Sequence, residues 1–169
     1  VIAQSELGKG TTICLYVPAL ATGAAAETEG DMSDLVGEGS ETILLVEDNA
    51  PAREATTALL EMMGYRVYTA EDGRAGLELF HRYGDTIHLV LSDLVMPEMG
   101  GLELYRKICD EKADICMLIM TGYPLDDEVH DTGERGTLEW LQKPFTVKQL
   151  TAAVRRVLER VKKVKNPEN

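Results

Sequence analysis

Carboxylate side chains end two apolar runs of this sequence and could act as metal ligands or as a nucleophile. Asp93 closes the run Leu89–Asp93, and Glu47 and Asp48 follow the run Ile43–Val46. Short apolar runs bounded by turn residues predict buried strands, and open α/β sheets keep their ligand sites where strands end. If the two strands are parallel neighbours, Glu47, Asp48 and Asp93 converge at one edge of a sheet.

Three carboxylates at one edge repel each other. Two unit charges about 4 Å apart interact by roughly 1 kcal/mol in water and about 4 kcal/mol at an intermediate dielectric constant. Such a cluster needs a proton, a lysine or a hard cation, and carboxylate and carbonyl oxygens suit Mg²⁺. The alternative is that the acidic residues only cap helices, which we favour for a single aspartate but not for two strand-terminal groups.

Two further strand-like runs end in polar groups. Ile115–Met120 leads into Thr121 and Gly122, and Leu138–Gln142 leads into Lys143. Taken singly, Thr121 predicts a helix N-cap and Lys143 a solvated surface residue. Together with the carboxylates, a hydroxyl, an unshielded backbone N–H and a compact ammonium are the groups needed to receive a phosphoryl group on a carboxylate.

The sequence resembles two-component receiver domains over about Glu41 to Lys163. The resemblance rests on Glu47-Asp48, Asp93 with Met96-Pro97 and Gly100-Gly101, Thr121-Gly122, and Lys143-Pro144-Phe145. It implies an α/β fold with a doubly wound five-stranded parallel sheet, flavodoxin-like (βα)5, with strand order 2-1-3-4-5. It also implies phosphorelay signal transduction by acceptance of a phosphoryl group from a phosphohistidine.

The resemblance gives each site residue a role. Asp93 is the phospho-acceptor, and Mg²⁺ or Mn²⁺ is held by Glu47, Asp48, Asp93 and the backbone carbonyl of Val95. Thr121, Gly122 and Lys143 bind phosphoryl oxygens, and Thr121 and Trp140 form a switch that alters the face made by the fourth and fifth helices and the fifth strand. Self-phosphotransfer and autodephosphorylation follow, without ATP-dependent kinase activity in these residues.

Three departures from the family pattern bear on this site. The first acid is Glu47 rather than aspartate, and Trp140 stands where Tyr or Phe is usual, with core packing as the alternative reading of the ring. Val95 and Tyr123 flank the pocket, where a valine cannot orient water and a tyrosine can screen it, and we hypothesise slow self-dephosphorylation. A half-life of seconds for the phosphorylated form would contradict that hypothesis.

The order along the chain predicts four parts. Residues 1–18, with Ser5, Gly8, Gly10 and Thr11 before an alternating run that ends at Pro18, resemble the closing segment of a histidine kinase ATP-binding domain. A simple β-hairpin is the alternative. Residues 19–40 predict a flexible linker, 41–165 the receiver and 166–169 a tail.

We therefore expect the C-terminal receiver of a hybrid histidine kinase. The alternatives are a freestanding response regulator and a phosphorylation-independent receiver-like binding module.

The apolar pattern from residue 41 alternates between strand and helix. Strands are expected at 42–47, 66–69, 89–93, 115–120 and 138–142. Helices are expected from Asn49 to Gly64, over 73–83 and 101–111, weakly over 123–133, and from Thr146, where Gln149 completes a capping box. The predicted apolar residues are Ala55, Leu59, Met62 and Met63 in the first helix and Leu150, Val154, Leu158 and Val161 in the last.

Composition limits the partners. The net charge of −12 and pI of about 4.7 argue against nucleic acid. We expect a cytoplasmic domain without membrane contact, because the three cysteines lack metal-ligand spacing and the sequence shows no leader or membrane-spanning run. The parent chain can carry a membrane anchor elsewhere. The expected partner is a histidine kinase dimerisation domain or a histidine phosphotransfer protein, with a receiver dimer as a further association.

Two other classes also bind phosphoryl groups at strand ends. A phosphohydrolase of the haloacid dehalogenase type needs a second aspartate two residues after the first, where this chain has Val95. A flavodoxin-like cofactor binder needs hydrogen-bond donors in its first loop, where Glu47 and Asp48 would repel a phosphate.

Overall fold

The computed structural model describes residues 2–6, 8, 10–14, 39–123 and 137–165. The chain divides into two compact units, Val1–Gly30 and Asp31–Asn169. In the first, β1 (Ile2–Glu6) and β2 (Gly10–Cys14) form an antiparallel hairpin with Glu6 opposite Gly10. The hairpin expected as the simpler alternative is present, and its second strand begins at Gly10, earlier than the alternating run suggested.

The second unit is built on a five-stranded parallel sheet. Its spatial order is β4 (Arg66–Ala70), β3 (Thr42–Val46), β5 (Leu89–Asp93), β6 (Cys116–Thr121) and β7 (Thr137–Gln142). Numbered within the sheet, this is the order 2-1-3-4-5, so the predicted fold class is confirmed.

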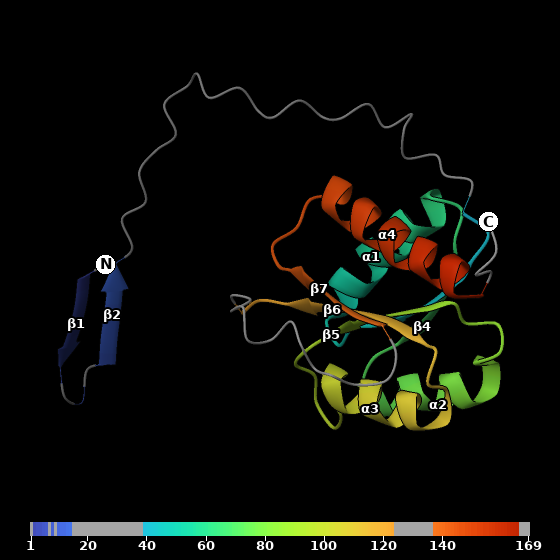
Figure 1. Ribbon diagram of the computed structural model, residues 1–169. Helices are drawn as coiled ribbons and strands as arrows, with labels where there is room; N and C mark the ends of the chain where they lie inside the picture. The colour runs from blue at the N-terminus through green and yellow to red at the C-terminus, as the bar shows by residue number, and fades with distance from the viewer. Residues whose placement is uncertain (1, 7, 9, 15–38, 124–136, 166–169) are drawn as a thin grey trace, which may run out of the picture. The chain divides into compact units, whose positions relative to one another are not determined.

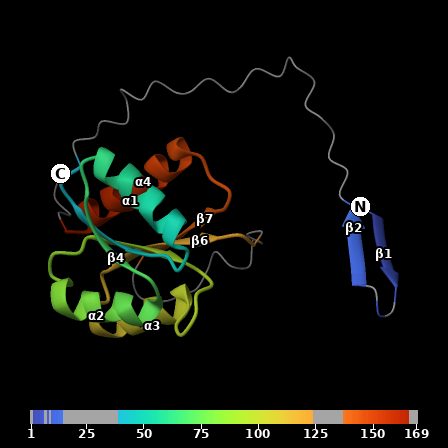
Figure 2. The same ribbon diagram turned by 180° about the vertical axis from the view of Figure 1, so that it is seen from behind.

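Helices cover both faces of this sheet. Helices α1 (Ala50–Met62) and α4 (Val147–Lys165) lie on one face, and α2 (Gly73–Tyr83) and α3 (Gly101–Glu111) on the other, as the two opposite views in Figures 1 and 2 show. Among the described residues, no helix combines the length and the apolar composition needed to cross a membrane.

Strand β3 shows why the sheet has a core on each side. Ile43 and Leu45 belong to the cluster under α1 and α4, and Leu44 and Val46 to the cluster under α2 and α3; all four are fully buried. Side chains alternate between faces along a strand, so a run without polar residues requires both faces to be covered.

The predicted inward face of α1 is partly wrong. Leu59 and Met63 contact the core, but Ala55 is exposed and Met62 is half exposed, while Thr56 and Leu60 are buried. The buried residues Thr56, Leu60 and Met63 follow the spacing i, i+4, i+7 of one helix face. The prediction followed apolar residue types and therefore missed an inward-facing threonine and an outward-facing methionine.

Helix boundaries follow their capping residues. Asn49 accepts a hydrogen bond from the Ala52 N–H at 3.0 Å at the start of α1, and Gly64 follows its end with a φ of 88°. The capping box before α4 is confirmed, since the Thr146 N–H donates to Gln149 Oε1 at 2.7 Å and the Gln149 N–H to Thr146 Oγ1 at 3.3 Å. Helices α2 and α3 have the predicted bounds, whereas the weak helix at 123–133 lies outside the described residues, apart from Tyr123.

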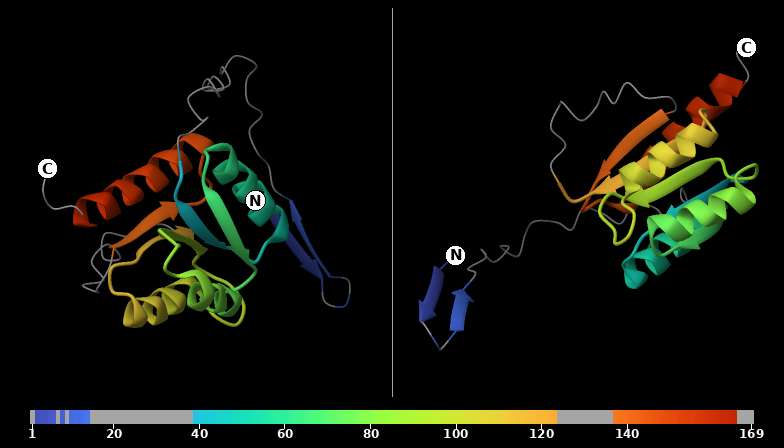
Figure 3. Two further views of the ribbon diagram at one scale, coloured as in Figure 1. Left: turned by 90° about the vertical axis from the view of Figure 1, so that its right-hand side faces the viewer. Right: turned by 90° about the horizontal axis from the view of Figure 1, so that it is seen from below.

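Strand register brings the predicted site residues to one edge of the sheet. Val46 pairs with Ser92, so Glu47 and Asp93 come next to each other; Asp93 pairs with Met120, and Thr121 pairs with Gln142. Figure 3 shows the twisted sheet between its helices from the side and from below. The carboxyl ends of β3, β5, β6 and β7 therefore meet at the place where an open α/β sheet binds ligands.

Helix α3 begins so close to Asp93 that only glycine fits at Gly101. The Gly101 N–H donates to Leu94 O at 3.0 Å, and a Cβ at Gly101 would lie 2.4 Å from Asp93 O and 3.1 Å from Ser92 Oγ. The absence of a side chain thus lets the helix pack against the backbone that carries Asp93.

We expect Gly101→Ala to destabilise the fold by about 1–3 kcal/mol, because the new methyl group must push the α3 backbone away from β5. Denaturant unfolding measures this change. Gly122→Ala is the matched control, since a Cβ there meets nothing within 4 Å; its stability should stay within about 0.5 kcal/mol of wild type. Equal stability of the two variants would contradict the close approach.

Candidate functional site

Three carboxylates meet at the carboxyl ends of β3 and β5. One oxygen from each of Glu47, Asp48 and Asp93 lies within 4.8 Å of the others. The side chain of Glu47 is 3% exposed, that of Asp93 is 17% exposed, and Asp48 is exposed. The site therefore runs from a buried acid to an open one, with Asp93 between them.

Lys143 is shared between two of the three acids. Its Nζ lies 2.8 Å from Glu47 Oε2 and 2.9 Å from Asp93 Oδ2. The lysine follows β7, whose register with β6 brings it to the edge, and its N–H donates to Thr121 O at 2.7 Å. A contact between Lys143 and Asp93 was expected, but the equally short contact with Glu47 was not.

The surroundings of Lys143 act on its pKa in opposite directions. Burial disfavours the ammonium, but hydrogen bonds and charge interactions with Asp93 and Glu47 outweigh it, so the pKa of Lys143 is raised above its ordinary value of 10.5. A raised pKa in the folded chain means that the stabilisation by this pair is fully present below pH 10.5. It is lost only as the pH rises through the raised pKa, so Lys143 is a cation at neutral pH.

The side-chain charges of the three acids and Lys143 do not balance one another. Three carboxylates give −3 and the Lys143 ammonium gives +1, which leaves −2. Oxygen ligands from carboxylates suit a hard divalent ion, which would cancel that remaining charge. The residues present therefore fit Mg²⁺ or Mn²⁺ in both charge and ligand type.

Asp93 is held at both carboxylate oxygens. The Leu94 N–H donates to Oδ1 at 2.7 Å, and Lys143 donates to Oδ2. Val95, two residues after Asp93, is 60% exposed, and Tyr123 is 65% exposed. Both side chains are therefore accessible to solvent, and their place beside the opening of the site stays a prediction.

Thr121 and Gly122 end β6 beside Asp93. The Thr121 hydroxyl is buried and accepts a hydrogen bond from the Tyr123 N–H at 3.0 Å, which leaves its own proton to donate. Gly122 is exposed, and no heavy atom lies where its Cβ would be. The end of β6 therefore offers a hydroxyl and an unshielded main chain next to the carboxylates.

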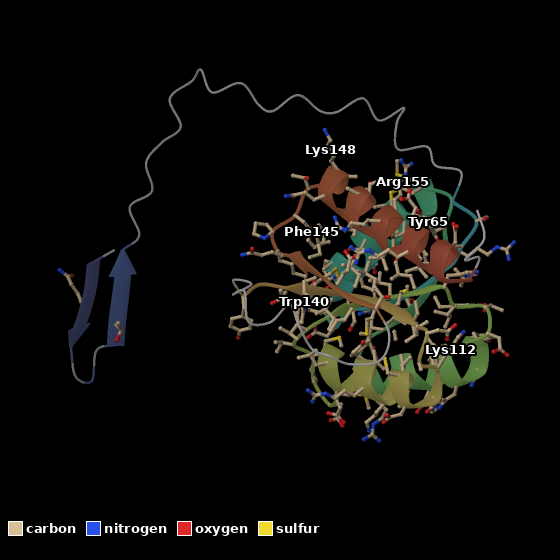
Figure 4. The ribbon with its side chains drawn as sticks, in the orientation of Figure 1. Tyr65, Lys112, Trp140, Phe145, Lys148 and Arg155 are labelled. Atoms are coloured by element: carbon tan, nitrogen blue, oxygen red, sulfur yellow. The ribbon has the colours of Figure 1, made fainter. Side chains whose placement is uncertain are left out.

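Trp140 lies on β7, three residues before Lys143. It is half-buried against the core under α2 and α3, whereas Phe145 packs against the core under α1 and α4 (Figure 4). Its partner in the register is Ile119. The Trp140 ring thus contributes to the core. The side chains of the acidic site meet beyond the carboxyl end of β7, the strand that holds this ring.

Strand β7 is also tied to α4 by charge. Glu139 Oε2 accepts from Arg156 Nε at 2.8 Å, and Oε1 lies 2.8 Å from Arg160 Nη1 as an ion pair without an aligned hydrogen bond. Glu139 and Trp140 are neighbours on opposite faces of the strand. The strand that carries the tryptophan is therefore anchored to the last helix.

Arg53 is a site neighbour that the sequence analysis missed. Its Nη1 donates to Glu47 O at 2.6 Å and lies 3.3 Å from Asp48 O. The spacing in the sequence could have indicated this contact. An arginine one turn into the helix that follows an acidic pair can fold back onto the loop before that helix.

Comparison with known proteins gives a consistent result. A family model described as the response regulator receiver domain matches residues 43–155. The sensor kinase CckA of Brucella abortus (strain 2308) is 35% identical over 169 residues, which cover 95% of this chain and 18% of that protein. The probable transcriptional regulator ycf27 of Guillardia theta is 36% identical over 132 residues, covering 77% of this chain and 50% of that protein.

Solved structures agree with these relatives. A response regulator receiver domain protein from Clostridium thermocellum has a TM-score of 0.68 and 28% identity, covering 74% of this chain and 99% of that one. The receiver domain of the hybrid histidine kinase CckA has a TM-score of 0.59 and 30% identity, covering 69% and 98%. The chain spans no more than half of the two full-length relatives described above.

Proposed function

The chain belongs to the response regulator receiver domain family, a family of phosphorelay signalling, and we propose that it accepts a phosphoryl group on Asp93. The observation that carries this proposal is the position of Asp93 between an ammonium and two further carboxylates. Glu47 is too buried for its carboxylate to attack a phosphoryl group that approaches from solution, and Asp48 lacks the contact with Lys143 that the other two acids have. Asp93 alone combines access with a neighbouring cation.

The reaction we propose is transfer from a phosphohistidine. A carboxylate oxygen of Asp93 forms the new bond to phosphorus, the P–N bond to the imidazole breaks, and the imidazole leaves with the bonding electron pair and takes up a proton. Lys143, released in part from Asp93, pairs with a phosphoryl oxygen, and the Thr121 hydroxyl and Gly122 N–H donate to others. The product is an acyl phosphate that adds about −1.5 to −2 charges.

We further propose Mg²⁺ as the resident cation, with Mn²⁺ as a substitute. Glu47, Asp48, Asp93 and the carbonyl of Val95 would hold it, and the unbalanced charge of the acidic cluster supports this assignment. When bound, such an ion offsets the negative charge of the reacting groups and orients phosphoryl oxygens.

The downstream effect we propose is a rotamer change of Trp140. New hydrogen bonds would draw Thr121 toward the phosphoryl group, and the ring would move into the space left at the end of β6. Its half-buried position supports this proposal, as does the anchoring of the same strand to α4 through Glu139. The face made by β7 and α4 would then report phosphorylation to a partner.

The partner we propose is a histidine kinase dimerisation domain or a histidine phosphotransfer protein, in the cytoplasm. We also propose that residues 1–18 end a kinase ATP-binding domain, 19–40 form a linker, 41–165 the receiver and 166–169 a tail. The similarity to the sensor kinase supports this division. The matched region covers 95% of the chain, whereas residues 43–169 make up only about three quarters of the chain. The match therefore extends into the segment before the receiver.

The tryptophan provides a direct test, because Trp140 is the only one in the sequence. We expect its fluorescence to change when beryllofluoride is added after Mg²⁺, since beryllofluoride mimics a phosphoryl group on a carboxylate. Asp93→Asn should remove the response to beryllofluoride. An unresponsive wild type, or a response that survives this substitution, would overturn the switch.

A further inference from the structure

We propose that Arg53 is a positioning residue of the acidic site, which holds the backbone of Glu47 and Asp48 so that Asp48 can bind the divalent cation. The inference rests on the proposed function and adds to it a residue outside the acidic and phosphoryl-binding groups. Its basis is the pair of contacts from Arg53 Nη1 to Glu47 O, at 2.6 Å, and to Asp48 O, at 3.3 Å.

The loop between β3 and α1 needs such an anchor. The last ladder bond from this strand is from the Glu47 N–H to Ala70 O at 3.1 Å, and α1 begins at Ala50. Between that bond and the start of α1, the carbonyl groups of Glu47 and Asp48 belong to neither the sheet nor the helix. Their oxygens therefore need hydrogen-bond donors from another part of the chain. One planar guanidinium reaches both of them, and its charge strengthens both bonds.

Arg53 is itself well placed to be rigid. Its N–H donates to Asn49 O at 2.9 Å within the first turn of α1, and its carbonyl accepts from Thr57 Oγ1 at 2.8 Å. The arginine thus joins the loop to a helix whose own start is capped by Asn49. A change at position 53 should loosen the loop without removing the helix cap.

Asp48 is the acid that depends most on this anchor. The Glu47 carboxylate is held by Lys143 Nζ at 2.8 Å and the Asn49 N–H at 3.4 Å, and Asp93 by Lys143 and the Leu94 N–H. Asp48 is exposed, so the direction of its carboxylate is set chiefly by its backbone. Loss of the Arg53 contacts should therefore weaken cation binding while Lys143 stays paired.

The test uses Mn²⁺ as the probe. Electron paramagnetic resonance measures the concentration of free Mn²⁺ during a titration of the protein, without any phosphodonor. Arg53→Met keeps most of the aliphatic stem and removes the donors, and we expect it to raise the dissociation constant of Mn²⁺ about tenfold. Arg53→Lys keeps the charge but only one compact donor, and should recover part of that loss. Amide hydrogen exchange at Asp48 and Asn49 should be faster in Arg53→Met than in wild type.

Two controls separate the possible causes. Arg155→Met removes the same charge from the outer side of α4 (Figure 4) and should leave the dissociation constant unchanged, while Asp48→Asn should abolish tight binding. Arg53→Met with wild-type or tighter Mn²⁺ binding, or with wild-type exchange, would overturn the inference. Full affinity in Arg53→Lys would also overturn it, since the guanidinium contacts to both carbonyls would then be dispensable. A wild-type chain that does not bind Mn²⁺ would instead contradict the proposed function, and this inference with it.

Discussion

Replacement of Asp93 by asparagine is expected to reduce covalent phosphorylation by a small phosphodonor at least about a thousandfold, because an amide oxygen is a poor nucleophile for phosphorus. Asparagine has nearly the shape of aspartate, and its oxygen can still accept from Leu94 N or Lys143 Nζ. The fold and the far helices should therefore be unchanged. Intact-mass spectrometry in the presence of Mg²⁺ measures the phosphorylated fraction.

Asp114→Asn is the matched control for this substitution. Asp114 is exposed and lies two residues before the first residue of β6, at the amino ends of the strands, whereas Asp93 lies at their carboxyl ends. The Asp114→Asn variant should be phosphorylated on Asp93 at the wild-type rate. Phosphorylation of Asp93→Asn at a comparable rate would mean that another side chain is the acceptor.

Lys143→Met is expected to act in opposite directions on cation binding and on phosphorylation. Loss of the ammonium changes the charge of the cluster from −2 to −3, so Mg²⁺ should bind about tenfold more tightly. The phosphorylation rate should fall by about 10²–10³-fold, because no ammonium remains to pair with the developing phosphoryl charge. Calorimetric titration with Mg²⁺ and the time course of phosphorylation measure the two effects.

The same substitution should also make stability depend on the cation. Without Lys143, the buried Glu47 carboxylate lacks its counter-charge, so the chain without Mg²⁺ should unfold more easily, and Mg²⁺ should restore much of the loss. Lys148→Met, at an exposed position near the start of α4, should change none of these quantities. Weaker Mg²⁺ binding in Lys143→Met would contradict the charge balance proposed for the site.

The strands could be predicted because apolar runs and turn residues mark them, whereas their order in the sheet came from the resemblance to receiver domains. Leu89–Asp93 is a strand with the predicted bounds, and α2 and α3 also begin and end as expected. Register then follows from parallel pairing, which brings strand-end residues together wherever they stand in the sequence. This is why Glu47, Asp93 and Lys143 could be grouped before their positions were known.

What the sequence did not reveal are contacts that depend on three-dimensional packing. The inward turn of Thr56 in α1 could not be read from residue types, because a threonine can lie on either face of a helix. The bridge from Lys143 to Glu47 depends on how far the lysine side chain, which follows β7, reaches past β6 and β5 to the end of β3. The fold of Arg53 back onto the loop likewise depends on a side-chain rotamer, which no spacing rule specifies.

The most direct measurement is to locate the phosphoryl group within the phosphorylated wild-type chain. The chain is phosphorylated with Mg²⁺ and a small phosphodonor, the acyl phosphate is reduced with borohydride, and the peptides are mapped by tandem mass spectrometry. We predict that the aspartate converted by reduction is Asp93. Conversion of Asp48 or Glu47 in its place, or a stable phosphoryl group on a histidine, would contradict the assignment of Asp93 as the acceptor.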